Sequence, residues 1–325
     1  MKITNLITKI LHGAVLSLAL SWTPAFEGAV IIVPSRGILT LQQGIDAAAS
    51  GDTVLVMPGV YTEPVGQWWP PVAHVREDKS DLKLKAAGAP GSVRIAGPGF
   101  GRGIFINAEN VSVEGFHISG FATGILAGGA PNRGGRIMRN TIQNCSSECV
   151  TVIGSSRYEI GHNTFEGGLS GVFLNGWPGA GPNTRHYIHH NEVRNADNGI
   201  FLWLSPECVI EHNEVTHSGS NGIYLAQSGH CTLSQNQAND GQAVGIAVSG
   251  SPGCQVNHNT ANNNEYWGIA VAGSCGSNFS HNSAEGNGEY DLFAPNWEGT
   301  EAECNSYSAN RAGAAFPSLF LWEAE

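Results

Sequence analysis

Apolar residues alternate with polar ones in short runs that recur at a fixed spacing along most of the chain. One anchor of this pattern is a glycine followed by apolar residues at every second position, at Gly171, Gly199, Gly222, Gly245 and Gly268. A second anchor is an asparagine three residues after an apolar residue, at Asn140, Asn163, Asn191, Asn213, Asn236, Asn259 and Asn282. Most intervals of both anchors are 23 residues. Two independent anchors that share one period predict a repeat protein.

Each period contains three runs of strand length. Residues 222–226, 231–234 and 237–239 are such runs, and Gly, Asn or Ser bounds each of them. Three short strands per turn, stacked about 4.8 Å apart, make a parallel β-solenoid. Period-2 alternation places Ile200 and Ile223 inside the coil and the residues between them outside. The pattern therefore predicts an all-β solenoid.

A short helix is expected before the coils. Thr40 stands where an N-cap is favoured, and Gly51 ends the helical pattern. This helix would cover the open end of the first coil, and a strand follows it at 52–57. We expect one domain over 29–325, with the capping helix at about 40–50, regular coils at about 103–293 and a C-terminal cap at about 294–325.

The segment IDAAASGDTVLVMPGVYTE at 45–63, followed by His-Asn and Gly-Ile repeats, resembles the pectate-lyase-like superfamily. The resemblance covers about residues 38–310. It implies a right-handed single-stranded parallel β-helix. Members include NosD-type periplasmic proteins, mannuronan epimerases and several polysaccharide lyases, so the resemblance implies a polysaccharide partner without specifying an activity.

Three catalytic signatures of these relatives have no evident match in the chain. The Asp-Pro-His-Asp run of mannuronan epimerases does not occur, and Phe201 occupies the outward position after Gly199. The aspartate cluster of pectate-lyase calcium sites and the paired aspartates of polygalacturonases are not evident either. No cofactor motif is evident and no metal ligand is assigned, although Ca²⁺ stays open from the resemblance.

The N-terminus has the pattern of a signal peptide. Lys2 and Lys9 precede an apolar run at 10–20 and small residues at 21–25. We expect residues 1–28 to be removed and the protein to be secreted or periplasmic. No later run reaches about 18 apolar residues, so no membrane span is expected. The net charge of -11 and the absence of a basic cluster argue against nucleic acid as a partner.

Cysteines recur five residues before three of the anchor asparagines. Cys208, Cys231 and Cys254 are in phase with inward residues and are expected to form a stack of buried thiols, with disulfide or metal use as the alternatives. Cys145 and Cys149 lie in one turn, where a local disulfide is as plausible as two free thiols. The seven cysteines leave at least one unpaired within a monomer.

Histidines precede most of the anchor asparagines. This row suggests a metal site, since imidazole is a frequent ligand of Zn and Cu. No carboxylate or thiolate recurs beside it, however, and turn histidines can simply bond the next coil. The row consists of His162, His190, His212, His258 and His281, and Gln235 interrupts it.

Large aromatic residues occupy outward positions on consecutive coils. Phe173, Phe201, Trp203 and Tyr224 follow the anchor glycines, whereas later coils have alanine or serine there. Such a patch, about 10 Å long, suits stacking on sugar rings, although an inserted loop could also cover it. The interval from Gly171 to Asn191 is six residues longer than its equivalents, which predicts an excursion near 175–184 that carries Trp177.

Candidate acid–base residues follow this excursion. Arg185 could neutralise a uronate carboxylate, His189 could take the C5 proton, and Tyr187 could protonate the leaving oxygen in β-elimination or epimerisation. Glu159 and Glu211 hold outward positions on the flanking coils. The alternative is that these residues form an ordinary polar turn without a catalytic role.

Three functions remain open at this point. A carbohydrate-binding or envelope scaffold needs only the aromatic face. A polysaccharide lyase or C5-epimerase needs the acid–base residues as well. A NosD-like copper-maturation factor is disfavoured because no Met/Cys cluster suits Cu(I).

Overall fold

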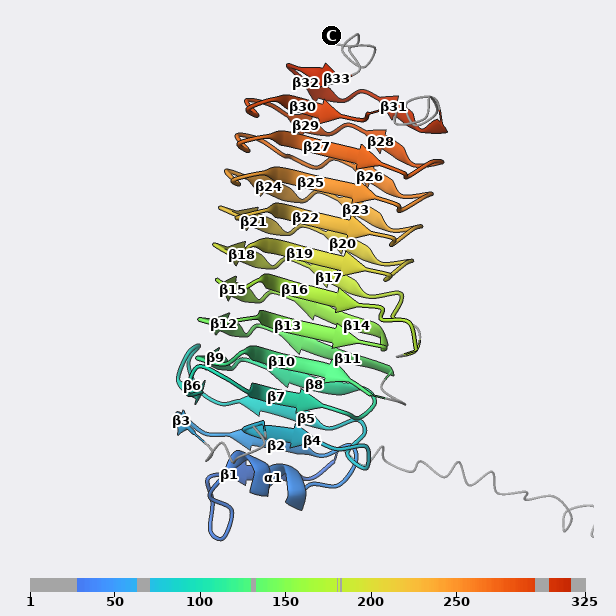
Figure 1. Cartoon of the computed structure of the whole chain (residues 1–325). Coiled ribbons are helices and arrows are strands. Elements are labelled where there is room, and N and C mark those ends of the chain that lie inside the picture. Colours follow the sequence, from blue (N-terminus) through green and yellow to red (C-terminus); the bar gives the residue numbers. More distant parts are fainter. Residues whose placement is uncertain are drawn as a thin grey trace, which may run out of the picture.

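The computed structural model is a right-handed parallel β-helix of about 12 turns (Figure 1). It describes residues 28–62, 71–129, 133–179, 181, 183–295 and 304–316. The expected signal peptide at 1–28 therefore falls almost wholly outside the described residues. Each turn contributes one strand to each of three long sheets over most of the rod, so the predicted all-β, right-handed solenoid is confirmed.

The largest sheet has 12 strands in sequence order along the rod. Its strands are β1 (Val30–Val33), β2 (Thr53–Val56), β5 (Lys83–Ala86), β8 (Val111–Glu114), β11 (Arg133–Met138), β14 (Ser156–Gly161), β17 (Tyr187–His189), β20 (Val209–Glu211), β23 (Thr232–Ser234), β26 (Gln255–Asn257), β28 (Asn278–Ser280) and β31 (Ser306–Ser308).

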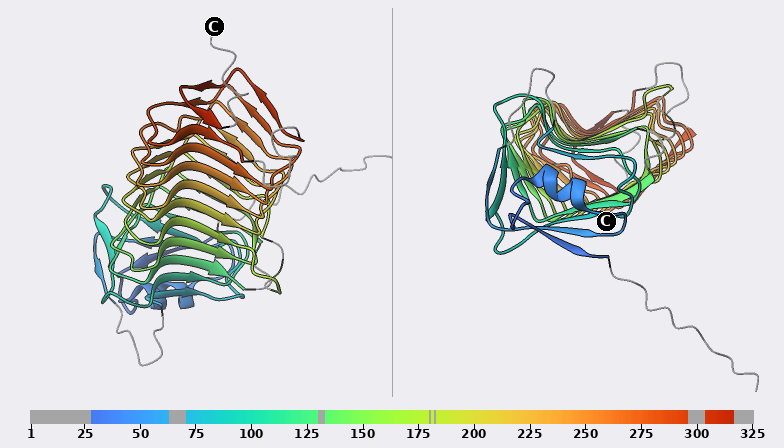
Figure 2. Two further views of the ribbon diagram at one scale, coloured as in Figure 1. Left: turned by 45° about the horizontal axis from the view of Figure 1, so that its top comes forward. Right: turned by 90° about the horizontal axis from the view of Figure 1, so that it is seen from below.

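The second sheet has 11 strands and contains the runs that follow the anchor glycines. Its strands are β4 (Ala73–Val75), β7 (Arg102–Ile106), β10 (Thr123–Gly128), β13 (Glu148–Ile153), β16 (Ser170–Asn175), β19 (Asn198–Trp203), β22 (Asn221–Ala226), β25 (Val244–Ser249), β27 (Trp267–Ala272), β30 (Tyr290–Phe293) and β33 (Ala315–Phe316). Seen from the end of the rod, the outer surface of this sheet curves inward (Figure 2, right). We call this surface the concave face.

The third sheet has eight strands, and a two-stranded sheet lies near the C-terminal end. The eight strands are β3 (Gly59–Tyr61), β6 (Val93–Ala96), β9 (His117–Ser119), β12 (Thr141–Gln143), β15 (Thr164–Glu166), β18 (Glu192–Arg194), β21 (Glu214–Thr216) and β24 (Gln237–Asn239). The other two are β29 (Ser283–Ala284) and β32 (Arg311–Ala312).

The anchor glycines are required by the close contact between successive coils. A Cβ built on Gly199 would lie 2.2 Å from Val215 Cγ1 and 2.4 Å from the carbonyl oxygen of Gly222. The inward side chains of β19 and β22, such as Ile200 and Ile223, are fully buried. Their parallel register stacks like residues on like residues, so one continuous apolar core runs along the rod.

The anchor asparagines form a buried hydrogen-bonded ladder. Asn213 Nδ2 donates to the carbonyl of Ile188 at 3.0 Å and to Asn236 Oδ1 at 2.9 Å. The backbone N–H of Asn213 donates to the same Oδ1 at 3.0 Å. The residue before each asparagine lies in the left-handed region, as His212 does at φ 55. The ladder thus satisfies the polar groups of a tight turn that would otherwise be buried without partners.

The predicted stack of buried thiols is confirmed. Cys208, Cys231 and Cys254 are free and fully enclosed, and the Cys208 N–H donates to Cys231 Sγ at 3.4 Å. Hydrogen bonding to Cys208 and burial raise the pKa of the Cys231 thiol. These thiols therefore pack as small apolar groups.

The other cysteines divide between free thiols and one disulfide. Cys145 and Cys149 are also buried and free, so the local disulfide considered from the sequence is absent. The disulfide instead joins Cys275 to Cys304, with Cα atoms 5.1 Å apart. It links the turn before β28 to a position two residues before β31.

The expected capping helix is present as α1 (Leu41–Ala47). Thr40 accepts a hydrogen bond from Gln43 N, and the Gln43 side chain binds the Thr40 N–H in return, which completes a capping box. The helix covers the open end of the first coil (Figure 2, right), and its Leu41 and Ile45 are fully buried. The helix ends three residues earlier than expected: the backbone is extended at Ala48, and the Ala49 N–H donates to Asp52 Oδ2 instead of continuing the helix.

Stacked strands extend beyond the range of regular coils expected from the sequence. The 12-stranded sheet starts at β1 and the 11-stranded sheet ends at β33, so coils are described from Val30 to Phe316. The early coils escape the sequence pattern because they lack the anchor asparagine. Within the described part of the chain, no helix combines the length and apolarity needed to cross a membrane.

Candidate functional site

The structure separates the predicted site residues into two groups on neighbouring sheets. The aromatic residues Phe173, Phe201 and Tyr224 lie on the concave face of the 11-stranded sheet. Tyr187 and His189 lie on β17 of the 12-stranded sheet. A corner of the solenoid separates the two groups, so they line two surfaces rather than one site.

The predicted aromatic residues stack along the middle of the concave face. Phe173, Phe201 and Tyr224 are directly in register on three adjacent strands. Their ring centroids are 5.0 Å apart at both steps, and the ring planes are tilted by 17° and 4°. Each ring is half-buried. The three rings form a continuous apolar strip that no inserted loop fully covers.

The predicted excursion leaves the coil at the edge of this strip. It starts after β16 ends at Asn175, and Trp177 on it is 58% exposed. The Trp177 ring packs edge-on against Trp203, with centroids 5.7 Å apart. Trp177 and Trp203 therefore extend the aromatic surface sideways from the strip.

A hollow continues the strip towards the C-terminal end of the rod. It has a volume of about 240 Å³, with Ala247 and Ala270 between the rings of Tyr224 and Phe293. Trp267 flanks it and stacks on Phe293 at 4.2 Å. Sequence reasoning missed Trp267 and Phe293, although Phe293 is in register with Ala270. The small alanines leave space because the residues on either side of them are large.

Charged side chains are absent from the five strands that carry the strip and the alanine floor of the hollow. The sequences of β16, β19, β22, β25 and β27 contain no Asp, Glu, His, Lys or Arg. Polar groups there are mainly amides, and Asn221 Nδ2 donates to Asn198 Oδ1 at 3.0 Å. The central concave face therefore offers stacking and hydrogen bonding rather than general acid–base chemistry.

The second group forms a polar cluster that we define as Arg136, Glu159, Tyr187, His189 and Glu211. Arg136 binds Glu159 with two hydrogen bonds, of 2.7 and 3.1 Å. Glu159 Oε1 lies 3.2 Å from His189 Nε2. Burial would raise the pKa of Glu159, but the hydrogen bonds from Arg136 and His189 outweigh it and lower the pKa. The carboxylate is therefore held charged beside the imidazole.

His189 is buried although strand alternation points it outward. Its ring lies against Gly161 on the adjacent strand, where an added Cβ would approach Cε1 at 2.5 Å. Tyr187 stacks on the other side with centroids 4.2 Å apart. The side chain of His189 is consequently only 7% exposed.

Tyr187 donates its hydroxyl proton to Glu211 in a short hydrogen bond. This bond, burial and the neighbouring carboxylates raise the pKa of Tyr187 to about 12. Tyr187 is therefore a protonated donor at neutral pH and is not suited to act as a base.

Arg185 does not contribute the cation of this cluster. It lies in the turn before β17 with φ 60, and its Nε binds Glu207 at 2.6 Å. The cation is Arg136, which the sequence analysis missed. Arg136, Glu159 and Tyr187 each stand four residues before an anchor asparagine. Aligning the coils on these asparagines would therefore have placed Arg136 beside Glu159.

The predicted row of histidines is an external stack. The rings of His162 and His190 are 4.9 Å apart, and those of His190 and His212 are 4.8 Å apart. His258 and His281 form a separate pair at 4.8 Å, on the other side of Gln235. Burial and neighbouring charged groups lower the pKa of His162 and His190.

Comparison with known proteins supports the fold assignment. The family described as "Right handed beta helix region" matches residues 129–287. An alginate lyase from Paenibacillus sp. str. FPU-7 is 14% identical with a TM-score of 0.61, over 88% of this chain and 99% of that chain. A periplasmic alginate epimerase is 12% identical with a TM-score of 0.53, over 83% of this chain and 71% of that chain.

A third structure of similar fold is also that of an epimerase. The A-module of an Azotobacter vinelandii mannuronan C-5 epimerase is 12% identical with a TM-score of 0.51, over 83% of this chain and 89% of that chain. No curated protein matches the sequence significantly. At these identities the likeness shows the fold alone. The chain thus has the right-handed parallel β-helix fold that its sequence repeats and motifs indicated.

Proposed function

We propose that the protein binds a polysaccharide along its concave face. The observation that carries the proposal is the strip of Phe173, Phe201 and Tyr224, whose rings are stacked at 5.0 Å and open to solvent. Aromatic rings bind the apolar faces of sugar rings, and a regular row of them suits a polymer. The alginate-acting proteins of similar fold support a polysaccharide as the ligand class.

The hollow beyond Tyr224 extends the proposed binding surface. Its alanine floor and the flanking Trp267 and Phe293 suit one or two sugar units at the end of the strip. Because the central strands carry no charged residues, binding should depend little on ionic strength. The sequence pattern of a signal peptide and the Cys275–Cys304 disulfide both fit a protein that works in the periplasm or outside the cell.

Affinity measurements on a panel of neutral and uronate polysaccharides test this proposal. Tyr224→Ala should weaken binding by about tenfold at most, since one stacked ring contributes roughly 0.5–1.5 kcal/mol. Tyr187→Ala is the matched control, because it removes a half-buried aromatic from the neighbouring sheet and should leave affinity unchanged. Equal affinities for wild type and Tyr224→Ala, or a loss confined to Tyr187→Ala, would rule out the concave face.

A second candidate function is lysis or epimerisation of a uronate polymer at the polar cluster. The charged Glu159 beside His189 and the proton held between Tyr187 and Glu211 favour it, because they pair an imidazole with a phenol donor. His189 would take the proton, Tyr187 would donate one, and Arg136 rather than Arg185 would be the nearby cation. If turnover stops when Ca²⁺ is removed with a chelator, the reaction also requires Ca²⁺.

Turnover assays separate the two candidates. Unsaturated products absorb in the ultraviolet and report lysis, and proton NMR reports epimerisation. If the polar cluster is catalytic, His189→Gln should reduce turnover by about 10²-fold or more while affinity stays within a few fold. No turnover on any uronate polymer, together with binding that depends on Tyr224, would leave only the binding function.

A further inference from the structure

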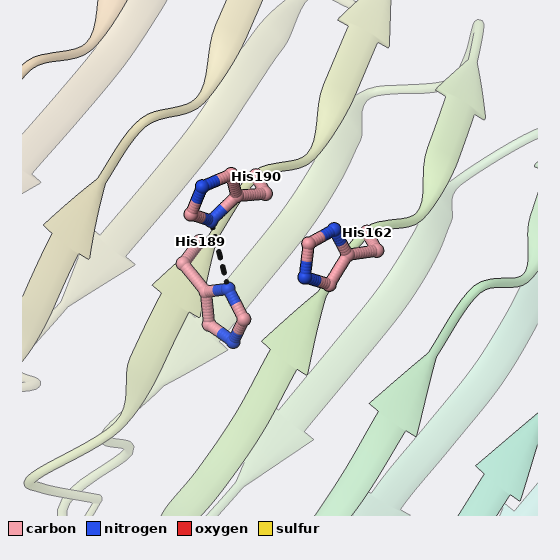
Figure 3. Close-up of side chains that lie close together, drawn as sticks. All are labelled: His162, His189 and His190. Carbon is pink, nitrogen blue, oxygen red and sulfur yellow. Dashed lines mark hydrogen bonds between the residues drawn. The ribbon is translucent and has the colours of Figure 1, made fainter.

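Three histidines from two coils meet at one point on the 12-stranded sheet. His162, His189 and His190 each place a ring nitrogen within 4.8 Å of the others (Figure 3). No other group of three or more His, Cys, Asp or Glu side chains with this spacing occurs in the described part of the chain. The group lies around the corner from the concave face and is independent of the polysaccharide binding proposed there. It shares His189 with the polar cluster of the second candidate function.

The backbone fixes two of these histidines side by side. His162 and His190 occupy equivalent turn positions on successive coils, with φ 56 and 51, and their rings stack with an interplanar angle of 21°. Each precedes a buried anchor asparagine, which holds the turn in place. The two exposed imidazoles are therefore presented together by the same ladder that builds the coil.

The third histidine differs because it comes from the strand. His189 is the last residue of β17, and its ring stands nearly perpendicular to those of His162 and His190, at 88° and 84°. The absence of a side chain at Gly161 gives this ring its space. The perpendicular ring directs Nδ1 at His190 Nδ1, only 3.1 Å away.

This nitrogen–nitrogen distance is close to that of two ligands on one metal ion. Metal–nitrogen bonds of about 2.0–2.1 Å in a tetrahedral site put neighbouring nitrogens about 3.3 Å apart. His162 is exposed, so a small rotation of its side chain can bring its nitrogen from at most 4.8 Å to the same distance. The trio needs little rearrangement to bind an ion.

An outer shell already orients the buried ligand. Glu159 accepts from His189 Nε2 at 3.2 Å and is itself held by Arg136 at 2.7 Å. A carboxylate on the far nitrogen of a histidine keeps the proton there, and it leaves the lone pair of the other nitrogen free for a metal. That lone pair is on His189 Nδ1, which in this arrangement accepts a hydrogen bond from His190 Nδ1–H. Once the His190 proton is on Nε2 instead, both Nδ1 atoms can bind an ion.

We propose that His162, His189 and His190 bind one divalent transition-metal ion through three imidazole nitrogens, with a fourth position open to solvent. Imidazole ligands suit Zn²⁺, Cu²⁺ and Ni²⁺, whereas Ca²⁺ requires oxygen ligands. Glu159 supports the site through His189 and does not itself contact the ion.

The same row of histidines supplies a matched control. His258 and His281 stack at 4.8 Å with parallel rings, in turns equivalent to those of His162 and His190. The position corresponding to His189 is Asn257 or Ser280 in those coils. This pair therefore has the two turn imidazoles without the third ligand.

The experiment is a Zn²⁺ titration of the full secreted chain, prepared without a histidine tag and stripped with a chelator, against a competing metal indicator. We expect one equivalent of Zn²⁺ with high affinity, and a loss of about 100-fold or more for His189→Ala and for His162→Ala. Glu159→Gln should weaken binding by about 10–100-fold because it removes only the outer-shell partner. His258→Ala should bind as wild type does.

A Cu²⁺ titration followed by electron paramagnetic resonance gives a second readout, since nitrogen hyperfine lines report the number of imidazoles. Circular dichroism of each variant checks that the coil is intact. Equal affinity in wild type and His189→Ala, or loss of binding on His258→Ala alone, would overturn the proposal. The proposal would also be overturned if the wild-type protein bound no equivalent of Zn²⁺ with high affinity.

Discussion

A single buried histidine shows how strongly position in the coil controls residue chemistry. His186 occupies the inward column that continues as Cys208 and Cys231, and only 1% of it is exposed. Its Nδ1 accepts a hydrogen bond from the Tyr158 N–H at 3.2 Å. Burial outweighs a backbone hydrogen bond to Ser155 and lowers the pKa of His186 to about 3.

This shift makes stability depend on pH. The unfolded chain protonates His186 below its ordinary pKa near 6.5, but the folded chain does so only near pH 3. Between these values the unfolded state binds more protons, so stability falls as pH falls. We expect the wild type to lose about 2 kcal/mol more than His186→Cys between pH 7 and pH 5, measured by urea unfolding.

Cysteine is the replacement of choice because the next two coils have Cys208 and Cys231 in that column, and Cys231 Sγ accepts the backbone N–H of Cys208. The other titrating groups are common to both proteins and cancel in the difference. Identical pH slopes for the two proteins would mean that His186 is protonated or hydrated inside the fold.

Individual site residues were only partly predictable for a physical reason. Alternation along a strand tells which side chains point outward, and it placed Tyr187 and Glu159 correctly on the outer surface. It does not tell which outward side chain of the next coil lies beside which. Arg185 therefore looked like the partner cation, while the register of β11 and β14 puts Arg136 on Glu159.

At the scale of the elements, the asparagine ladder explains why the coils were readable from the sequence. The regular coils repeat one backbone path, so the same residue recurs wherever that path needs an amide or has no room for a Cβ. Asn213 illustrates the amide, and Gly199 illustrates the missing Cβ. The angle between two sheets leaves no such mark, which is why the aromatic strip and the polar cluster seemed to be one site.

The ladder predicts a large cost for removing one asparagine. In Asn213→Ala the carbonyl of Ile188 and the N–H of Asn191 lose partners at 3.0 Å while staying buried. Each unsatisfied group costs about 1–3 kcal/mol, so the free energy of unfolding should fall by about 3 kcal/mol or more. Thermal or urea unfolding measures this loss. Gln237→Ala, at an exposed strand position one coil away, should change stability by less than about 0.5 kcal/mol.

At the scale of the whole molecule, curvature creates features that no local pattern contains. The hollow between Tyr224 and Phe293 exists because two alanine coils lie between aromatic ones on an inward-curving sheet. In the sequence these alanines mark only the end of the run of outward aromatic residues. The alanines form the floor of a hollow only because Phe293 lies beyond them, and the pairing of Ala270 with Phe293 is visible only in the register of the strands.

The ends of a solenoid are its weakest parts, because a terminal coil has a neighbour on one side only. At the N-terminal end α1 provides the missing neighbour. At the C-terminal end the Cys275–Cys304 disulfide closes a segment with a sequence separation of 29 residues. Closing a loop of that length lowers the conformational entropy of the unfolded segment, which stabilises the folded state by roughly 3–4 kcal/mol. The disulfide should therefore keep β31, β32 and β33 on the rod.

We expect the double variant Cys275→Ser, Cys304→Ser to lose the last coil without losing the rest. Hydrogen exchange should become faster across β30 to β33, whereas the strands around β19 and β22 should keep wild-type protection, because stability in a solenoid propagates mainly between neighbours. Dithiothreitol should reproduce this pattern in the wild type and have no effect on the variant. Faster exchange along the whole rod would show instead that the coils unfold as one cooperative unit, and unchanged exchange at the C-terminal end would show that packing alone holds the last coil.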